Sequence, residues 1–417
     1  MAAASQEKID GNVTWLIKNA DIASFFGGGI NEASPVTGDI NVNINNSHVG
    51  LYCGGPKFGN MTSTDTKKAT VETTATSCTF GEFFGAGYGG TALYRDIWSP
   101  GNNQGHNQYM SVNYNWSSWL GDSRGYSRGQ YVSGKGIAVS FETEQFEGSA
   151  DKTVARLYVN FATMSVARTN SVTSRLSDCT INKNFYGGGN LGSVNGNLSS
   201  TLTNCKVYGN VFGAGCSSTA PTAEVYDSPT SGNFKGVYYN SSTGVFEPTI
   251  YPPKVEYTWS DENGGNTDTT TLIGTGDNVK HWIHTDVSLS GLGIVEGKVT
   301  LNIDGNTVVM GQEVSEDADG NITYGAQTGG IFGGGDASAV IGETEVVINA
   351  SGLKSGYAYN VQNVYGGGNN GEIKSNTSGA TGNAVVTLRG NTVVNADVFG
   401  GGNKGVVEGS ATVNITE

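Results

Sequence analysis

The stretch Asp178–Gly215, DCTINKNFYGGGNLGSVNGNLSSTLTNCKVYGNVFGAG, contains one pattern twice and decides the fold. Each copy starts near a cysteine and ends in an aromatic residue followed by Gly-Gly-Gly or Gly-Ala-Gly. The first glycines of the two copies, Gly187 and Gly213, are 26 residues apart. A repeat of this length forms one supersecondary unit that buries its apolar face by stacking on its neighbours, so the stretch indicates a solenoid.

The same pattern extends over most of the 417 residues. Glycine-rich units begin at Phe25, Leu51, Phe83, Phe185, Val211, Ile331, Val364 and Val398. Units that lie close together are 26 to 34 residues apart, whereas two longer steps of 102 and 120 residues contain insertions. Between units, segments such as DINVNIN from Asp39 alternate β-branched and polar residues, which is typical of strands. We therefore predict an all-β chain, a parallel β-helix whose coils are right-handed because crossover connections almost always are.

Equivalent side chains of stacked coils lie above one another at about 4.8 Å, so each repeated residue type predicts a ladder. The expected aromatic ladder consists of Phe26, Phe84, Tyr186, Phe212, Phe332, Tyr365 and Phe399. The asparagine that follows the glycine triplet predicts an amide ladder of Asn190, Asn369 and Asn403. The glycines are expected to form a corner. They are needed there either for a positive φ or for an approach of two backbones that leaves no room for a Cβ atom.

Cys179 and Cys205 occupy the same position in adjacent coils, because both they and their following aromatic residues are 26 apart. Their distance is within disulfide reach, but stacked Cβ vectors are parallel, which is poor disulfide geometry. A reduced, buried pair is therefore favoured over a bond.

Two insertions interrupt the coils. We expect coils over 1–87, 137–216 and 296–417, a Tyr/Trp-rich insertion over 88–136, and a hairpin and linker insertion over 217–295. In the first insertion, aromatic rings lie among amide and guanidinium donors, a composition that suits a sugar ring or a protein partner. The candidate ligand-binding residues are Tyr94, Trp98, Tyr109, Tyr114, Trp116, Trp119, Tyr126 and Tyr131. The alternative, that these rings only pack the insertion onto the coils, stays open.

Charge and composition exclude several classes of function. With 37 acidic and 23 basic residues the net charge is −14, so a nucleic-acid partner is not expected. No apolar run approaches the length of a membrane span. Asp178, Asp336 and Asp397 each lack a second carboxylate at fixed spacing, and no Cys/His metal spacing occurs. We predict no catalytic residue, metal or cofactor. The first residues lack a secretory signal and the last break off a strand pattern, so we expect a longer polypeptide whose signal is absent here.

The Asp178–Gly215 stretch resembles the large FGGGN-repeat proteins of gut Bacteroidales. The resemblance covers most of the chain and implies a secreted or cell-surface, adhesin-like β-helical protein. It favours a non-catalytic stalk or adhesin that binds glycans or extracellular proteins through its inserted loops. Two alternatives remain. One is a polysaccharide lyase or glycoside hydrolase on a parallel β-helix, which needs convergent carboxylates or a basic residue in a groove. The other is a structural filament module.

Overall fold

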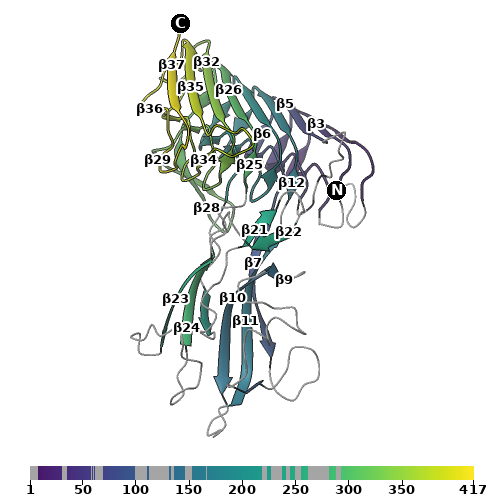
Figure 1. The fold of residues 1–417 in the computed structure, drawn as a ribbon. Coiled ribbons are helices and arrows are strands. Elements are labelled where there is room, and N and C mark those ends of the chain that lie inside the picture. The colour runs from purple at the N-terminus through teal and green to yellow at the C-terminus, as the bar shows by residue number, and fades with distance from the viewer. Residues whose placement is uncertain are drawn as a thin grey trace. The chain divides into compact units, whose positions relative to one another are not determined.

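The computed structural model divides the chain into two compact units, which are described separately (Figure 1). The first unit comprises Met1–Gly90, Ser165–Ser217 and Leu292–Glu417, and the second comprises Thr91–Met164 and Ser218–Gly291. The structure describes residues 8–30, 35–57, 59, 61, 69–98, 110–111, 131–132, 136–145, 153–165, 167–217, 223–226, 237–240, 245–248, 255–261, 281–287 and 293–417.

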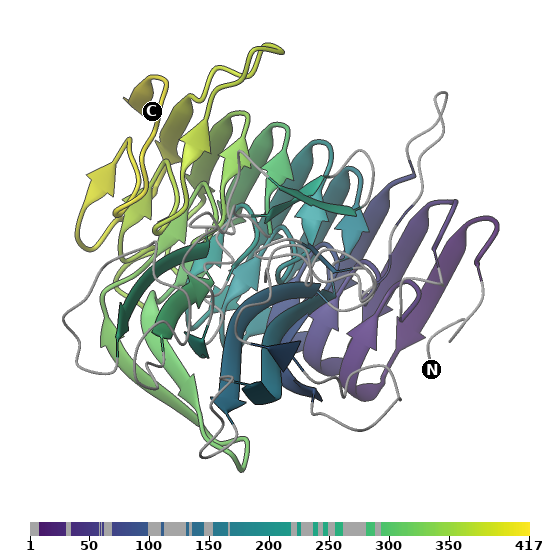
Figure 2. The same ribbon diagram turned by 60° about the horizontal axis from the view of Figure 1, so that its bottom comes forward.

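The first unit is a parallel β-helix, which confirms the predicted fold class. Its longest parallel ladder has nine strands, one from each coil, stacked from the purple to the yellow end in Figure 2. These strands are β1 (Val13–Lys18), β3 (Ile40–Asn45), β5 (Val71–Thr76), β13 (Val172–Ser177), β17 (Leu198–Thr203), β26 (Val299–Gly305), β32 (Thr344–Ala350), β35 (Ala384–Gly390) and β37 (Ala411–Ile415). Neighbours pair in register, for example Val172 with Leu198 and then Val299. The right-handed sense of the coils stays a prediction.

Two further parallel sheets complete each coil. An eleven-stranded sheet contains β2 (Asp21–Phe26), β4 (His48–Cys53), β6 (Thr79–Phe84), β14 (Thr180–Ile181), β15 (Phe185–Tyr186), β18 (Lys206–Val207), β19 (Val211–Phe212), β27 (Val308–Val309), β30 (Ile331–Phe332), β33 (Val364–Tyr365) and β36 (Val398–Phe399). A five-stranded sheet contains β12 (Arg168–Thr169), β16 (Ser193–Val194), β25 (Val295–Glu296), β31 (Val340–Ile341) and β34 (Ile373–Lys374). Every second residue is buried along the inner strands of the nine-stranded sheet, as Ile40, Val42 and Ile44 of β3 show, so one continuous apolar core runs through the coils.

The predicted aromatic ladder is present over six residues. Ring centroids from Phe84 through Tyr186, Phe212, Phe332 and Tyr365 to Phe399 are 4.7–5.1 Å apart and nearly parallel. This row forms an apolar cluster apart from the main core.

Phe26 departs from the predicted row. Cys53 stands in register between Phe26 and Phe84, so the stack is interrupted. Phe26 meets Tyr88 edge-on at 5.8 Å instead. A second row, not predicted, lies inside the core: Phe25, Tyr52, Phe83 and Phe185 stack with centroids 4.6–5.2 Å apart.

The glycine triplets form the corner through close approach. A Cβ atom on Gly187 would lie 2.3 Å from the carbonyl oxygen of Gly213, and one on Gly213 would lie 2.3 Å from that of Gly333. Of the two explanations left open from the sequence, close approach holds for the triplets, because no described triplet glycine has a positive φ. Positive φ occurs two residues later instead, at Leu191 (53°) and Asn370 (57°) among others.

Cys179 and Cys205 are free and buried, as favoured from the sequence. Cys78 extends the column by one coil, and each thiol donates a hydrogen bond to a backbone carbonyl two residues earlier, at Thr76 (3.2 Å), Ser177 (3.2 Å) and Thr203 (3.4 Å). The next coil places Thr307 in the column, where its hydroxyl accepts a hydrogen bond from the Cys205 N–H at 3.1 Å.

The second unit is built from antiparallel strands of both insertions. One sheet contains β7 (Gly90–Trp98), β11 (Thr153–Ser165), β10 (Gly136–Gln145), β9 (Tyr131–Val132) and β8 (Met110–Ser111). Another contains β20 (Ala223–Tyr226), β24 (His281–Val287) and β23 (Val255–Asp261), and β21 (Val237–Asn240) pairs with β22 (Val245–Pro248). The first insertion is therefore longer than the expected 88–136, because β10 pairs antiparallel with β11 and the coils resume only at β12.

Candidate functional site

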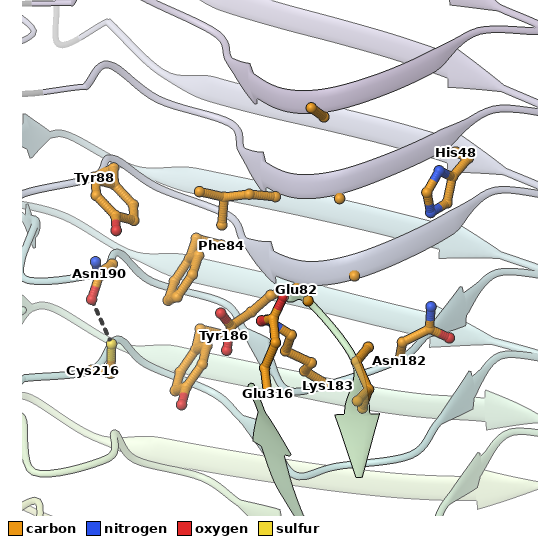
Figure 3. A pocket seen from close by; sticks show the side chains of 16 residues that line it. His48, Glu82, Phe84, Tyr88, Asn182, Lys183, Tyr186, Asn190, Cys216 and Glu316 are labelled. Carbon is orange, nitrogen blue, oxygen red and sulfur yellow. Dashed lines mark hydrogen bonds and ion pairs between the residues drawn. The ribbon is translucent and has the colours of Figure 1, made fainter. Parts of the chain in front are cut away.

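A groove of about 580 Å³ lies on the outer face of the eleven-stranded sheet, entirely within the first unit (Figure 3). Phe83 belongs to the main core and its neighbour Phe84 to the separate aromatic row, so successive side chains of β6 point to opposite faces. The outer face of β4 and β6 forms the floor of the groove. One wall is the hairpin of β28 (Gln312–Glu316) and β29 (Ile322–Gln327), which is inserted into the sixth coil.

Two glycines leave part of the floor without side chains. Gly50 and Gly81 line it, and a Cβ atom on Gly81 would lie 2.2 Å from the Gly50 carbonyl oxygen. The close approach of the coils therefore excludes larger residues here and leaves a flat strip of backbone.

Three charged side chains meet at the centre of the groove (Figure 3). Glu82 comes from β6, Lys183 from the connection between β14 and β15, and Glu316 from the end of β28. Lys183 and Glu316 form an ion pair. Burial raises the pKa of the Glu82 carboxyl; Lys183 opposes this effect and the nearby Glu316 adds to it. The groove thus holds a carboxyl that is hard to ionise beside one that is paired.

Aromatic and polar groups form one end of the groove. Tyr88 lies edge-on to Phe84, with centroids 6.3 Å apart and rings inclined at 84°. Beside them, the Cys216 thiol donates a 3.1 Å hydrogen bond to the Asn190 Oδ1. At the other end, His48 Nδ1 lies 2.8 Å from Asp21 Oδ1.

The predicted amide ladder is part of a mixed polar column. Asn403 donates to Asn369 Oδ1 at 3.0 Å, and Asn369 donates to Asp336 Oδ1 at 3.0 Å. Cys216 and Asp336 separate Asn190 from these asparagines, as the strand-like bridges from Asn190 to Cys216 and on to Asp336 show. The column therefore tolerates amide, carboxyl and thiol groups at one position.

Side-chain contacts at two places, besides a backbone hydrogen bond from the Gln312 N–H to Tyr208 O (3.1 Å), hold the hairpin against the coils. Tyr324 stacks on Tyr208 with ring centroids 4.8 Å apart, and Glu316 pairs with Lys183. At its tip, Asp317 Oδ1 accepts hydrogen bonds from the N–H groups of Asp319 (3.0 Å) and Asn321 (2.8 Å). That carboxylate closes the turn. No cluster of three metal-ligating side chains occurs among the residues that the structure describes.

The ligand-binding residues predicted in the first insertion are not brought into this groove by any described contact. Tyr94 and Trp98 lie on β7, and Tyr131 lies on β9. The other five, Tyr109, Tyr114, Trp116, Trp119 and Tyr126, lie outside the described residues.

Glu82, Lys183 and Glu316 were missed from the sequence, although Glu82 carries a signal. It stands in the repeat position that Asn184 and Asn210 occupy in the next two coils. Those asparagines serve the backbone: Asn184 Oδ1 accepts from the Asn210 N–H and Asn210 Oδ1 from the Gly330 N–H, both at 2.8 Å. Because the preceding coil holds Leu51 in this column, alignment of the repeats shows Glu82 only as a change from the two asparagines that follow it.

No family model, curated protein or solved structure matches this chain. In the part of the chain that the structure describes, no helix is long and apolar enough to cross a bilayer.

Proposed function

We propose that the chain is a non-catalytic, secreted or cell-surface β-helical protein of the stalk or adhesin type. Its coils act as a rigid support, and its second unit is the part displayed for binding a glycan or an extracellular protein. The resemblance of the glycine units to FGGGN-repeat surface proteins supports this proposal, and so does the way the insertions are attached.

The main support for the proposal comes from the positions at which the two insertions join the coils. Uninterrupted coils turn the corner in six residues, as in Gly189–Val194 and Gly335–Val340, with a positive φ at Leu191 and Ala337. Both insertions enter the chain inside this same corner, after the glycine triplets of the third and fifth coils. The corner is a surface turn between strands, where insertion leaves the parallel ladders intact. Two insertions at equivalent corners that cluster into one unit are suited to display.

The corner also supplies the test. Deleting 90–166 leaves Gly87-Tyr88-Gly89-Ala167-Arg168-Thr169, and deleting 218–292 leaves Gly215-Cys216-Ser217-Gly293-Ile294-Val295, each as long as an uninterrupted corner. The full chain and the double deletion are compared on glycan arrays and on extracellular-matrix proteins. We expect the double deletion to lose ligands that the full chain binds, while the β-sheet circular dichroism of the coils is retained. A binding profile unchanged by the deletion would contradict display by the second unit.

A glycoside hydrolase or lyase is the second candidate, and the charged centre of the groove favours it. Burial raises the pKa of Glu82, whereas Glu316 is paired with Lys183, and such unequal carboxyls suit acid and base roles. Reducing-sugar release from a panel of polysaccharides tests this candidate. Activity lost in Glu82→Gln would establish it, and absence of turnover across the panel would reject it.

A further inference from the structure

We propose that the groove is a second binding site, separate from the displayed unit, for a neutral pyranose segment of a glycan chain. The inference goes beyond the proposed function, which assigns binding to the insertions. It rests on the charges, the floor and the aromatic end of the groove.

The carboxyl at the centre of the groove lacks a hydrogen-bond donor, which a ligand hydroxyl group can supply. Glu82 is half-buried on the outer face of β6, and no described residue donates a hydrogen bond to its carboxyl. A carboxylate that is partly removed from water and lacks protein donors gains from the hydroxyl groups of a ligand, and its partial burial raises its pKa. Sugar hydroxyls donate to carboxylates and accept from the Lys183 ammonium and the Asn182 amide, both of which line the same groove. One ligand class therefore satisfies donors and acceptors together.

The balance of charge selects a neutral ligand. Two carboxylates, Glu82 and Glu316, face one ammonium, and that ammonium is already paired with Glu316. An anionic uronate chain would meet like charge at Glu82 with no free cation beside it. A metal ion lacks a third ligand, since no such cluster occurs among the described residues.

The shape of the groove suits a ring rather than an extended peptide. The glycine strip at Gly50 and Gly81 is flat, and Tyr88 presents an aromatic ring at its end. β4 is paired on both sides, with β2 and β6, so a peptide cannot add as a further strand on this floor. A volume of about 580 Å³ lies within the usual range for a small-molecule site.

The test measures binding of neutral hexasaccharides by calorimetry to the full chain. The probes are cellohexaose, mannohexaose, laminarihexaose and maltohexaose, with hexagalacturonate as the anionic counterpart. We expect at least one neutral probe to bind, and hexagalacturonate to bind at least tenfold more weakly. Glu82→Gln should weaken binding about tenfold, because a hydrogen bond to a charged acceptor is replaced by a neutral one.

Two variants separate a binding role from a structural one. Glu345→Gln is the matched control, because it removes an ion pair with Lys298 (2.7 Å) on the nine-stranded sheet, away from the groove; binding should be unchanged. Lys183→Met should weaken binding as Glu82→Gln does. Hydrogen exchange with bound probe should show protection in 48–53, 79–84 and 312–327. No binding by any neutral probe, tighter binding of hexagalacturonate, or binding insensitive to both groove variants would overturn the proposal.

Discussion

Replacing Gly333 by alanine tests the reason for the glycine triplets. A Cβ atom on Gly333 would lie 2.2 Å from the Gly366 carbonyl oxygen, well inside van der Waals contact, so the two coils must separate locally by about 1 Å. Two backbone hydrogen bonds cross that contact, from the Gly333 N–H to Tyr365 O (2.9 Å) and from the Gly334 N–H to Gly367 O (3.1 Å). Separation would lengthen both beyond the normal range.

The expected loss of stability follows from these contacts. Each hydrogen bond contributes about 0.5–1.5 kcal/mol, and the Phe332–Tyr365 stack at 4.7 Å contributes a similar amount. Gly333→Ala should therefore lower the free energy of unfolding by about 2–4 kcal/mol. Urea unfolding followed by far-ultraviolet circular dichroism measures the change.

Two control positions lie at the last triplet. A Cβ atom on Gly400 would come no closer than 3.2 Å to another atom, and one on Gly401 would meet nothing within 4 Å. Gly400→Ala should cost less than about 1 kcal/mol, and Gly401→Ala should be neutral or slightly stabilising because the unfolded chain loses freedom. Equal effects of all three substitutions would refute close approach as the reason for the glycines.

Three further predictions concern the aromatic row, the thiols and Glu82. Phe212 is 1% exposed and stacks on rings at 4.9 Å on both sides, whereas Phe399 is 44% exposed with one neighbour at 5.1 Å. In urea unfolding, Phe212→Ala should lower the free energy of unfolding by about 3–5 kcal/mol and Phe399→Ala by about 1 kcal/mol. Similar losses for the two variants would contradict the stacking account. Because Cys53, Cys78, Cys179 and Cys205 are buried, Ellman's reagent should react with them only after denaturation. The Cys216→Ser variant, which lacks the one cysteine that is only partly buried, tests this directly. Rapid reaction of the folded variant would contradict the burial of the four thiols. The pKa of Glu82 is raised on folding, so its protonated form is favoured in the folded state and stability is lost as pH rises through the folded pKa. Glu82→Gln should therefore have a higher melting temperature than wild type at pH 7, and this difference should disappear below pH 4.5. A difference in melting temperature that stays constant across pH would rule out this titration.

The repeat made the architecture predictable because each coil solves the same packing problem. The spacing of Gly187 and Gly213 matches the register in which Tyr186 pairs with Phe212, so the ladders followed directly from alignment. Phe26 was assigned wrongly because counting aromatic residues ignored Cys53, which occupies the same position one coil later. The φ of the glycines was not readable, since both explanations of a glycine corner leave the same residues in the sequence.

The groove could not be predicted because its parts are distant in sequence and belong to no repeated pattern. Lys183 and Glu316 are 133 residues apart and meet only because the hairpin lies against the coils. The direction of the hairpin depends on the Tyr208–Tyr324 stack, which alternation and spacing do not encode.

The proposed groove site lies where the chain departs from the repeat. Where the column holds Asn184 or Asn210, the side chain accepts a hydrogen bond from the backbone of the following coil, so packing explains the residue. Glu82 makes no such bond; its burial disfavours the charged carboxylate, and the sixth coil carries an extra hairpin whose Glu316 lies beside it. The same column holds Leu51 one coil earlier and Asn184 one coil later, so the stacking of the coils does not require a carboxyl at Glu82. Two independent departures that meet in one groove are the expected mark of a binding site placed on a scaffold that is otherwise regular.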